Sequence, residues 1–141
     1  MSDTLKVCGL TIERGTKLRT YLPVPDTNVK IPLTIINGDQ DGPTLLITAG
    51  IHGGEYPGIA AAMELGRDIE PEHVAGCLIM MHPVNIQGFW ARREMIVPED
   101  GKNLNRVFPG DPMGTLADKT AYLISNNFFS IADFYVDMHS G

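Results

Sequence analysis

The sequence predicts an α/β fold in which a mixed, mostly parallel sheet carries helices on both faces. Two observations support this prediction. Short apolar runs of strand length alternate along the chain with segments of helical periodicity. The runs 44–49 and 77–81 are almost continuously apolar, which is typical of central strands that are covered on both faces.

The first part of the chain indicates three strands. Residues 6–12 and 17–22 alternate moderately and flank the turn-forming residues 13–16, so we expect these two strands to form a hairpin. Residues 29–36 have the pattern of a third strand. The run of Asn, Asp and Gly at 37–42 then ends this strand before the central strand 44–49 begins.

Helical signals follow the central strand. A glycine-rich turn at 50–54 precedes a predicted helix from about Pro57 to Asp68, in which Pro57 takes a first-turn position. Residues 83–114 form a long segment with little periodicity, and such a segment is usually functional or contains an unrecognised element. Thr115 to Asp118 resembles a capping box at the start of a last helix, and residues 134–138 have the pattern of a last strand.

Length and composition limit the classes of protein. The 141 residues suit one domain or an incomplete one, and 43% hydrophobic with 20% charged residues is typical of a soluble globular chain. The net charge of −6, with no basic cluster larger than Arg92–Arg93, argues against a nucleic-acid partner. No apolar run reaches the length of a signal peptide or a membrane helix, so we expect no membrane partner and a cytoplasmic location. Cys8 and Cys77 are expected to be buried, reduced thiols.

Two segments place metal-ligand side chains directly after predicted strands. His52 and Glu55 follow the strand 44–49, and His139 follows the strand 134–138. Binding sites of α/β sheets lie beyond the carboxyl ends of their strands, so these side chains should meet. Two imidazoles and one carboxylate suit Zn²⁺ with a fourth position open to water. A His-x-x-Glu sequence alone is common by chance, so the prediction of one zinc ion per chain depends on the joint pattern.

A third segment, Asn103 to Gly110, lies between the two ligand segments. Taken alone it is a solvated loop. Beside a zinc site, Arg106 could make a bidentate contact to a substrate carboxylate, and Asn105 could add an amide donor. The sequence therefore predicts a site for a small carboxylate substrate.

The segments GIHGGEYPG at 50–58, NLNRVFPG at 103–110 and DMHSG at 137–141 resemble, in the same order, the succinylglutamate desuccinylase and aspartoacylase family. This family is related to the zinc carboxypeptidases, so the resemblance implies a zinc carboxypeptidase-like, or phosphorylase/hydrolase-like, fold.

The resemblance also implies roles for single residues. His52, Glu55 and His139 would bind zinc, and Asn105 with Arg106 would hold the substrate carboxylate. Members of the family carry another arginine, upstream of the Asn-Arg pair, that polarises the scissile carbonyl. Either Arg92 or Arg93 could match this arginine.

The chain departs from the family pattern in two places. Asn103 stands where many relatives have an Asp that orients a zinc-bound histidine; the amide can still accept from an imidazole N–H but supplies no negative charge. The family's catalytic Glu lies well downstream of the last histidine ligand, whereas this sequence ends two residues after His139. We therefore expect residues 1–141 to be the N-terminal part of a zinc metallohydrolase catalytic domain, an incomplete domain without the segment that carries this Glu.

The function implied by the resemblance is zinc-dependent hydrolysis of the amide bond of N-acylated amino acids. Two alternatives stay open: a metallocarboxypeptidase that acts on peptides, and a catalytically inactive metal-binding fragment. An exposed sheet edge beside residues 134–138 would favour pairing with a second copy, so we also expect homo-oligomers.

Overall fold

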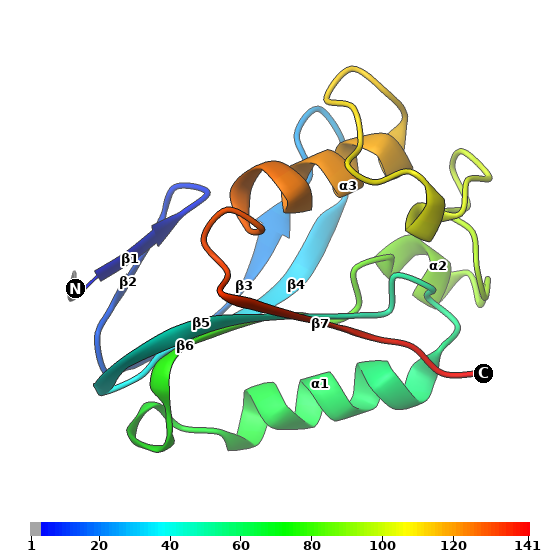
Figure 1. Ribbon diagram of the computed structural model, residues 1–141. Helices are drawn as coiled ribbons and strands as arrows, with labels where there is room; N and C mark the ends of the chain where they lie inside the picture. The colour runs from blue at the N-terminus through cyan, green and yellow to red at the C-terminus, as the bar shows by residue number, and fades with distance from the viewer. Residues whose placement is uncertain (1–3) are drawn as a thin grey trace.

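The computed structural model describes residues 4–141. At its centre is a five-stranded mixed sheet with the strand order β3-β4-β6-β5-β7. The bounds of these strands are β3 Thr16–Pro23, β4 Lys30–Asn37, β5 Gln40–Ala49, β6 Ala75–Met81 and β7 Phe134–Met138. Helix α1 (Tyr56–Asp68) covers one face of the sheet and helix α3 (Leu116–Asn127) covers the other (Figure 1).

The mixed α/β sheet with helices on both faces is confirmed. Its four strand pairings divide equally between the two directions: β3–β4 and β4–β6 are antiparallel, whereas β6–β5 and β5–β7 are parallel. The parallel half arises because α1 carries the chain back from the end of β5 to the start of β6. Strands β5, β6 and β7 therefore all end at the same edge of the sheet, where a site is expected.

The expected hairpin between residues 6–12 and 17–22 is wrong. The first segment folds back on itself at Cys8 and Gly9, whose φ angles of 49° and 76° both lie in the left-handed region that a tight type I′ hairpin turn requires. Strands β1 (Thr4–Val7) and β2 (Leu10–Glu13) consequently pair as a separate two-stranded sheet. Strand β3 pairs with β4 instead, which buries Leu22 and Ile31.

The long segment 83–114 contains two short helices. Helix α2 (Ile86–Trp90) begins at Asn85, whose side-chain oxygen accepts a hydrogen bond of 2.9 Å from the N–H of Gly88. The 3₁₀ helix η2 (Leu104–Arg106) is anchored by Leu104, which is fully buried. A second 3₁₀ helix, η1 (Pro71–His73), leads into β6.

Helix α3 has the predicted start and buries one apolar face. The carboxylate of Asp118 accepts from both the backbone N–H and the hydroxyl of Thr115, each at 2.9 Å. Ala117, Ala121, Ile124 and Phe128 are fully buried against the sheet. These side chains join the apolar residues of β4, β5 and β6 in the main core.

The remaining predictions concern single features. Cys77 is buried, Cys8 is half-buried and both are free thiols; burial raises the pKa of Cys77 to about 12. Strand β7 is an edge strand, with Phe134, Tyr135 and Val136 exposed along it, so the exposed sheet edge is present. Within residues 4–141, no helix has the length and apolar character needed to cross a membrane.

Candidate metal centre

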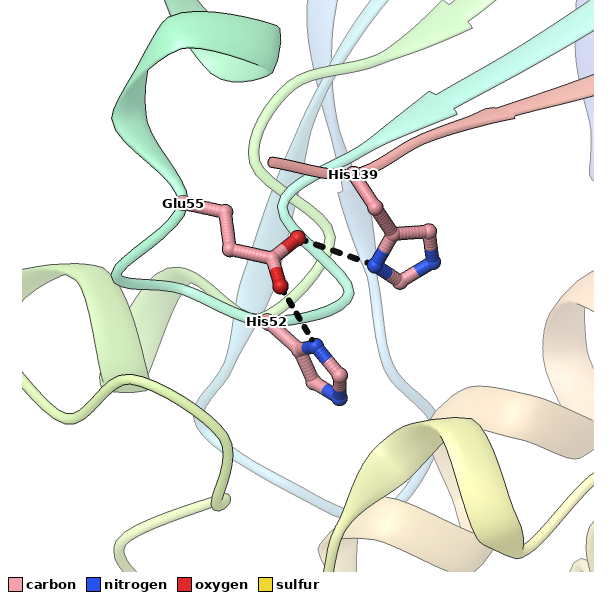
Figure 2. Close-up of side chains that lie close together, drawn as sticks. All are labelled: His52, Glu55 and His139. Atoms are coloured by element: carbon pink, nitrogen blue, oxygen red, sulfur yellow. Dashed lines mark hydrogen bonds and ion pairs between the residues drawn. The ribbon is translucent and has the colours of Figure 1, made fainter. Parts of the chain in front are cut away.

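The three predicted ligands come together at the end of the parallel strands. Strands β5 and β7 pair in parallel with Ala49 opposite Met138, so the residues that follow them emerge side by side. His52 lies in the turn after β5, Glu55 directly precedes α1, and His139 follows β7. Figure 2 shows the carboxylate of Glu55 between the two imidazole rings.

Two glycines allow this convergence. Gly50 has a φ of 72°, and a Cβ there would lie 2.6 Å from Cβ of Pro83, so the sharp turn from β5 toward His52 requires glycine. Gly58 in the first turn of α1 faces the end of β7, where a Cβ would lie 3.2 Å from Cβ of Met138. The close approach at Gly58 holds the start of α1 against the end of β7.

The ligand atoms form a compact set. Nδ1 of His52 lies 2.9 Å from Oε1 of Glu55, and Nδ1 of His139 lies 2.9 Å from Oε2 of the same carboxylate. One ligand atom from each residue fits within a mutual distance of 4.8 Å. The side chains of His52 and Glu55 are 7% and 11% exposed, whereas that of His139 is 32% exposed, so the centre opens to solvent on the His139 side.

The outer nitrogen of each imidazole also has an acceptor. Nε2–H of His52 donates to Oδ1 of Asn103 at 3.0 Å, and Nε2–H of His139 donates to a carboxylate oxygen of Asp137 at 2.7 Å. Histidines that bind metals commonly donate their other ring N–H in this way, which fixes the tautomer and the ring orientation. The geometry thus turns Nδ1 of both rings toward one point.

Electrostatics keep the centre ready for a cation. Burial alone would raise the pKa of Glu55, but hydrogen bonds from His52 and from the N–H of Ser140, together with the charge on His139, lower it. Burial opposes protonation of His139, but its contacts with Asp137 and Glu55 outweigh this effect and raise its pKa. Glu55 therefore stays ionised, which is the form in which a carboxylate binds a metal ion.

The structure places Arg92 and Arg93 in the exposed turn that follows α2. The next residue, Glu94, accepts a backbone hydrogen bond of 3.3 Å from Gly54, so this turn is attached to the ligand segment. Neither guanidinium has a hydrogen bond or ion pair among the described residues. Arg92 has a φ of 54°, a left-handed conformation that is uncommon for a non-glycine residue.

Asn105 and Arg106 lie in η2, which is joined to the centre through Asn103. The side-chain oxygen of Asn103 caps η2 by accepting from the N–H of Asn105 at 2.9 Å while it also accepts from His52. This double contact confirms that an amide at position 103 can accept from the imidazole. The Arg106 guanidinium is exposed and contacts the backbone oxygen of Asn105 at 3.3 Å; within residues 4–141 it pairs with no carboxylate.

Sequence reasoning assigned no role to three polar residues behind His139. Asp137 contacts the outer nitrogen of His139, Thr48 contacts Asp137, and Tyr135 contacts the hydroxyl of Thr48. The signal that could have found two of them, Asp137 and Tyr135, is the period of β7: Tyr135, Asp137 and His139 alternate with the apolar Phe134, Val136 and Met138. A polar row on one side of an apolar strand indicates a network that leads to the site.

Comparison with known proteins identifies the family of this chain. The sequence profile of the succinylglutamate desuccinylase/aspartoacylase catalytic domain matches residues 41–141. The N-alpha-acetyl-L-2,4-diaminobutyric acid deacetylase of Halomonas elongata is 40% identical over 128 residues, which cover 86% of this chain and 37% of that enzyme.

Two solved structures show the same arrangement of the chain. The product-bound ectoine utilization protein EutE (DoeB) from Ruegeria pomeroyi has a TM-score of 0.84 and 38% identity, over 92% of this chain and 41% of that one. A succinylglutamate desuccinylase/aspartoacylase from Rhodobacter sphaeroides has a TM-score of 0.80 and 36% identity, over 90% and 41%. The chain thus spans less than half the length of these relatives. It belongs to the succinylglutamate desuccinylase/aspartoacylase family, whose members are hydrolases.

Proposed function

We propose that residues 1–141 are the metal-binding N-terminal part of a zinc-dependent hydrolase that cleaves the amide bond of N-acylated amino acids. The observation that carries the proposal is the convergence of His52, Glu55 and His139 on one point at the ends of β5 and β7. The name of the Halomonas elongata relative, a deacetylase of an N-acetylated amino acid, supports this class of substrate.

The ligand set fits zinc. Two imidazole nitrogens and one carboxylate leave room for water or substrate, and a zinc ion held there supplies a polarised carbonyl and a bound water of lowered pKa. Asn103 and Asp137 accept hydrogen bonds from Nε2 of His52 and of His139, respectively, so both rings are oriented before a substrate binds.

Arg106 is the proposed anchor for the substrate carboxylate. Its guanidinium is exposed and pairs with no carboxylate among the described residues, so its donors are available to a ligand. A planar fork of N–H groups binds a carboxylate in two parallel hydrogen bonds, and Asn105 offers a neighbouring amide. Because Asn103 joins η2 to His52, the backbone segment that carries Arg106 is tied to this proposed metal ligand.

Arg92 or Arg93 is the proposed stabiliser of the oxyanion that forms on the scissile carbonyl. Both lie in the turn that contacts the ligand segment at Gly54, and both guanidinium groups are exposed. The comparison of Arg92→Ala with Arg93→Ala in the complete enzyme distinguishes the two. Replacing the arginine that has this role should lower kcat far more than it raises KM.

The general base is proposed to come from outside these residues. Among residues 4–141, the carboxylates in contact with the ligand histidines are Glu55 and Asp137, and both are engaged. Glu55 accepts from both rings, and Asp137 holds His139. The 141-residue chain alone should therefore hydrolyse its substrate roughly 10²–10⁴-fold more slowly than an enzyme with a positioned base.

The proposal is tested with the complete gene product, loaded with zinc and assayed on N-acetyl and N-succinyl amino acids and on C-terminal dipeptides. Deacylation faster than dipeptide cleavage supports the proposal, and the reverse favours a carboxypeptidase. Arg106→Ala should raise KM by roughly 30–150-fold, since a charge-assisted contact contributes about 2–3 kcal/mol. Arg67→Ala, which removes an exposed arginine paired with Asp68, is the matched control and should change nothing. Equal KM values for the two variants would exclude the anchor role.

A further inference from the structure

A chain of hydrogen bonds runs from the sheet edge to His139. Thr48 of β5 lies opposite Asp137 of β7, and its hydroxyl is 2.7 Å from one carboxylate oxygen of Asp137. The same hydroxyl is 2.7 Å from the phenolic oxygen of Tyr135. The other carboxylate oxygen of Asp137 is 2.7 Å from Nε2 of His139.

The donor and the acceptor in each of these hydrogen bonds follow from counting protons. A carboxylate accepts hydrogen bonds and does not donate them, so the hydroxyl of Thr48 must donate its single proton to Asp137. Thr48 can then only accept from Tyr135, whose phenol must be the donor. Partial burial of Tyr135, with a smaller effect of the Asp137 charge, raises the pKa of its phenol to about 12 despite the contact with Thr48, so the phenol keeps its proton at neutral pH.

We propose that Thr48 and Tyr135 are positioning residues for His139: acting through Asp137, they hold its ring so that Nε2 carries the proton and Nδ1 faces the metal. This inference rests on the metal centre proposed above. Asp137 receives one bond from Thr48 and one from His139, so both of its oxygens are fixed and the carboxylate cannot rotate.

The two proposed histidine ligands are held by different contacts, which explains why His139 needs the hydrogen-bond chain formed by Asp137, Thr48 and Tyr135. His52 is buried, and its acceptor Asn103 is fixed by a backbone N–H of η2. His139 has a side chain 32% exposed and follows β7, the edge strand of the sheet. Thr48 is fully buried in the central strand β5, so it ties the ligand at the edge to the rigid part of the sheet.

The test measures zinc affinity of the 141-residue chain by competition with a colorimetric chelator. Thr48→Val keeps the shape but removes the donor to Asp137, and it should weaken zinc binding roughly 10-fold. Tyr135→Phe leaves the donor from Thr48 in place, so it should weaken binding only about 3-fold. The double variant should bind zinc like Thr48→Val alone, because the phenol acts through Thr48.

A second measurement reads the position of the proton. Long-range ¹H–¹⁵N spectra of the zinc-loaded chain should show His139 protonated at Nε2 alone, and Thr48→Val should broaden or shift this signal. Thr48→Ser keeps the hydroxyl and should restore both the affinity and the spectrum. Thr34→Val is the matched control: Thr34 is equally buried in the same sheet, but its hydroxyl is 2.9 Å from His82, away from the ligands.

The outcomes separate the two proposals. If Thr48→Val and Tyr135→Phe bind zinc as tightly as the unmodified chain, while His139→Ala loses it, the metal centre stands and the positioning role is wrong. If the unmodified chain and His139→Ala bind zinc equally, the metal centre itself is wrong and the inference falls with it. If Thr48→Val does not fold, Tyr135→Phe and its His139 spectrum decide the question.

Discussion

Replacing Asn103 with aspartate adds a negative charge directly behind His52 while it preserves the size of the side chain. Oδ1 of Asn103 accepts from Nε2 of His52 at 3.0 Å and from the N–H of Asn105 at 2.9 Å. An aspartate can keep both contacts. A carboxylate behind a metal-bound imidazole makes it a more basic ligand, so Asn103→Asp should strengthen zinc binding.

The size of the effect follows from these contacts. A hydrogen bond to a charged group contributes about 1.5–3 kcal/mol, against about 0.5–1.5 kcal/mol for a neutral pair, so the gain at His52 is about 1 kcal/mol. This gain corresponds to a zinc affinity roughly 5- to 10-fold higher. Asn103→Ala removes the acceptor of both contacts and should lower the affinity roughly 10–100-fold.

Chelator competition at pH 8, where protons compete least for the imidazoles, measures these affinities. Asn105→Asp is the control, because it places the same charge two residues away, within η2, where the side chain makes no hydrogen bond to His52 among residues 4–141, and it should change zinc affinity less than about 2-fold. If Asn103→Asp and Asn105→Asp gave the same affinity, the contact behind His52 would have no influence on the metal, and the reasoning would be refuted.

Three further outcomes are expected. Gly50→Ala should lower the free energy of unfolding by at least ~3 kcal/mol in urea titrations, because the φ of Gly50 is left-handed and a Cβ would strike Pro83. Gly101 has a similar φ but open space around it, so Gly101→Ala should lower the free energy of unfolding by only about 1 kcal/mol. Equal losses of stability would show that Pro83 does not crowd position 50. The Lys102 ammonium beside Asp118 lowers the pKa of this carboxyl to about 2, below its value in the unfolded chain. The stability that the ionised Asp118 contributes to the fold is therefore fully present above pH ~4 and disappears toward pH 2. Asp118→Asn should therefore be about 1 kcal/mol less stable in urea at neutral pH, with a difference that shrinks from pH 4 downward; a constant difference would exclude this pair as its source. We propose that the exposed edge strand β7 pairs with a second copy of the chain, so Val136→Lys should reduce self-association in sedimentation experiments without altering zinc affinity; unchanged association, or none in the unmodified chain, would exclude this contact.

The sheet and its two large helices could be predicted because their signals are local. The apolar runs at 44–49 and 77–81 became β5 and β6, and the periodic segment after Thr115 became α3. The first hairpin was wrong because the deciding signal was two residues, Cys8 and Gly9, inside a segment that alternates as one strand. Helix α2 was missed because five residues are too few to show a helical period.

The convergence of His52, Glu55 and His139 could be predicted because each follows a strand, but their surroundings could not. The contact of Asn103 with His52 depends on how η2 packs, which no spacing in the sequence specifies. The link from Thr48 to Asp137 depends on the register of two strands that are far apart in the sequence. Pairing of distant strands is set by tertiary packing, so the polar row of β7 shows its meaning only in the folded sheet.

The central claim is that His52, Glu55 and His139 hold one metal ion, and zinc content after dialysis tests it most directly. The unmodified chain should retain about one zinc per molecule, since its three ligands suit one tetrahedral site. His52→Ala, Glu55→Ala and His139→Ala should each lose it, whereas His73→Ala, which removes an exposed histidine of η1, should retain it. Zinc retained by His52→Ala or His139→Ala at the level of the unmodified chain would contradict the account.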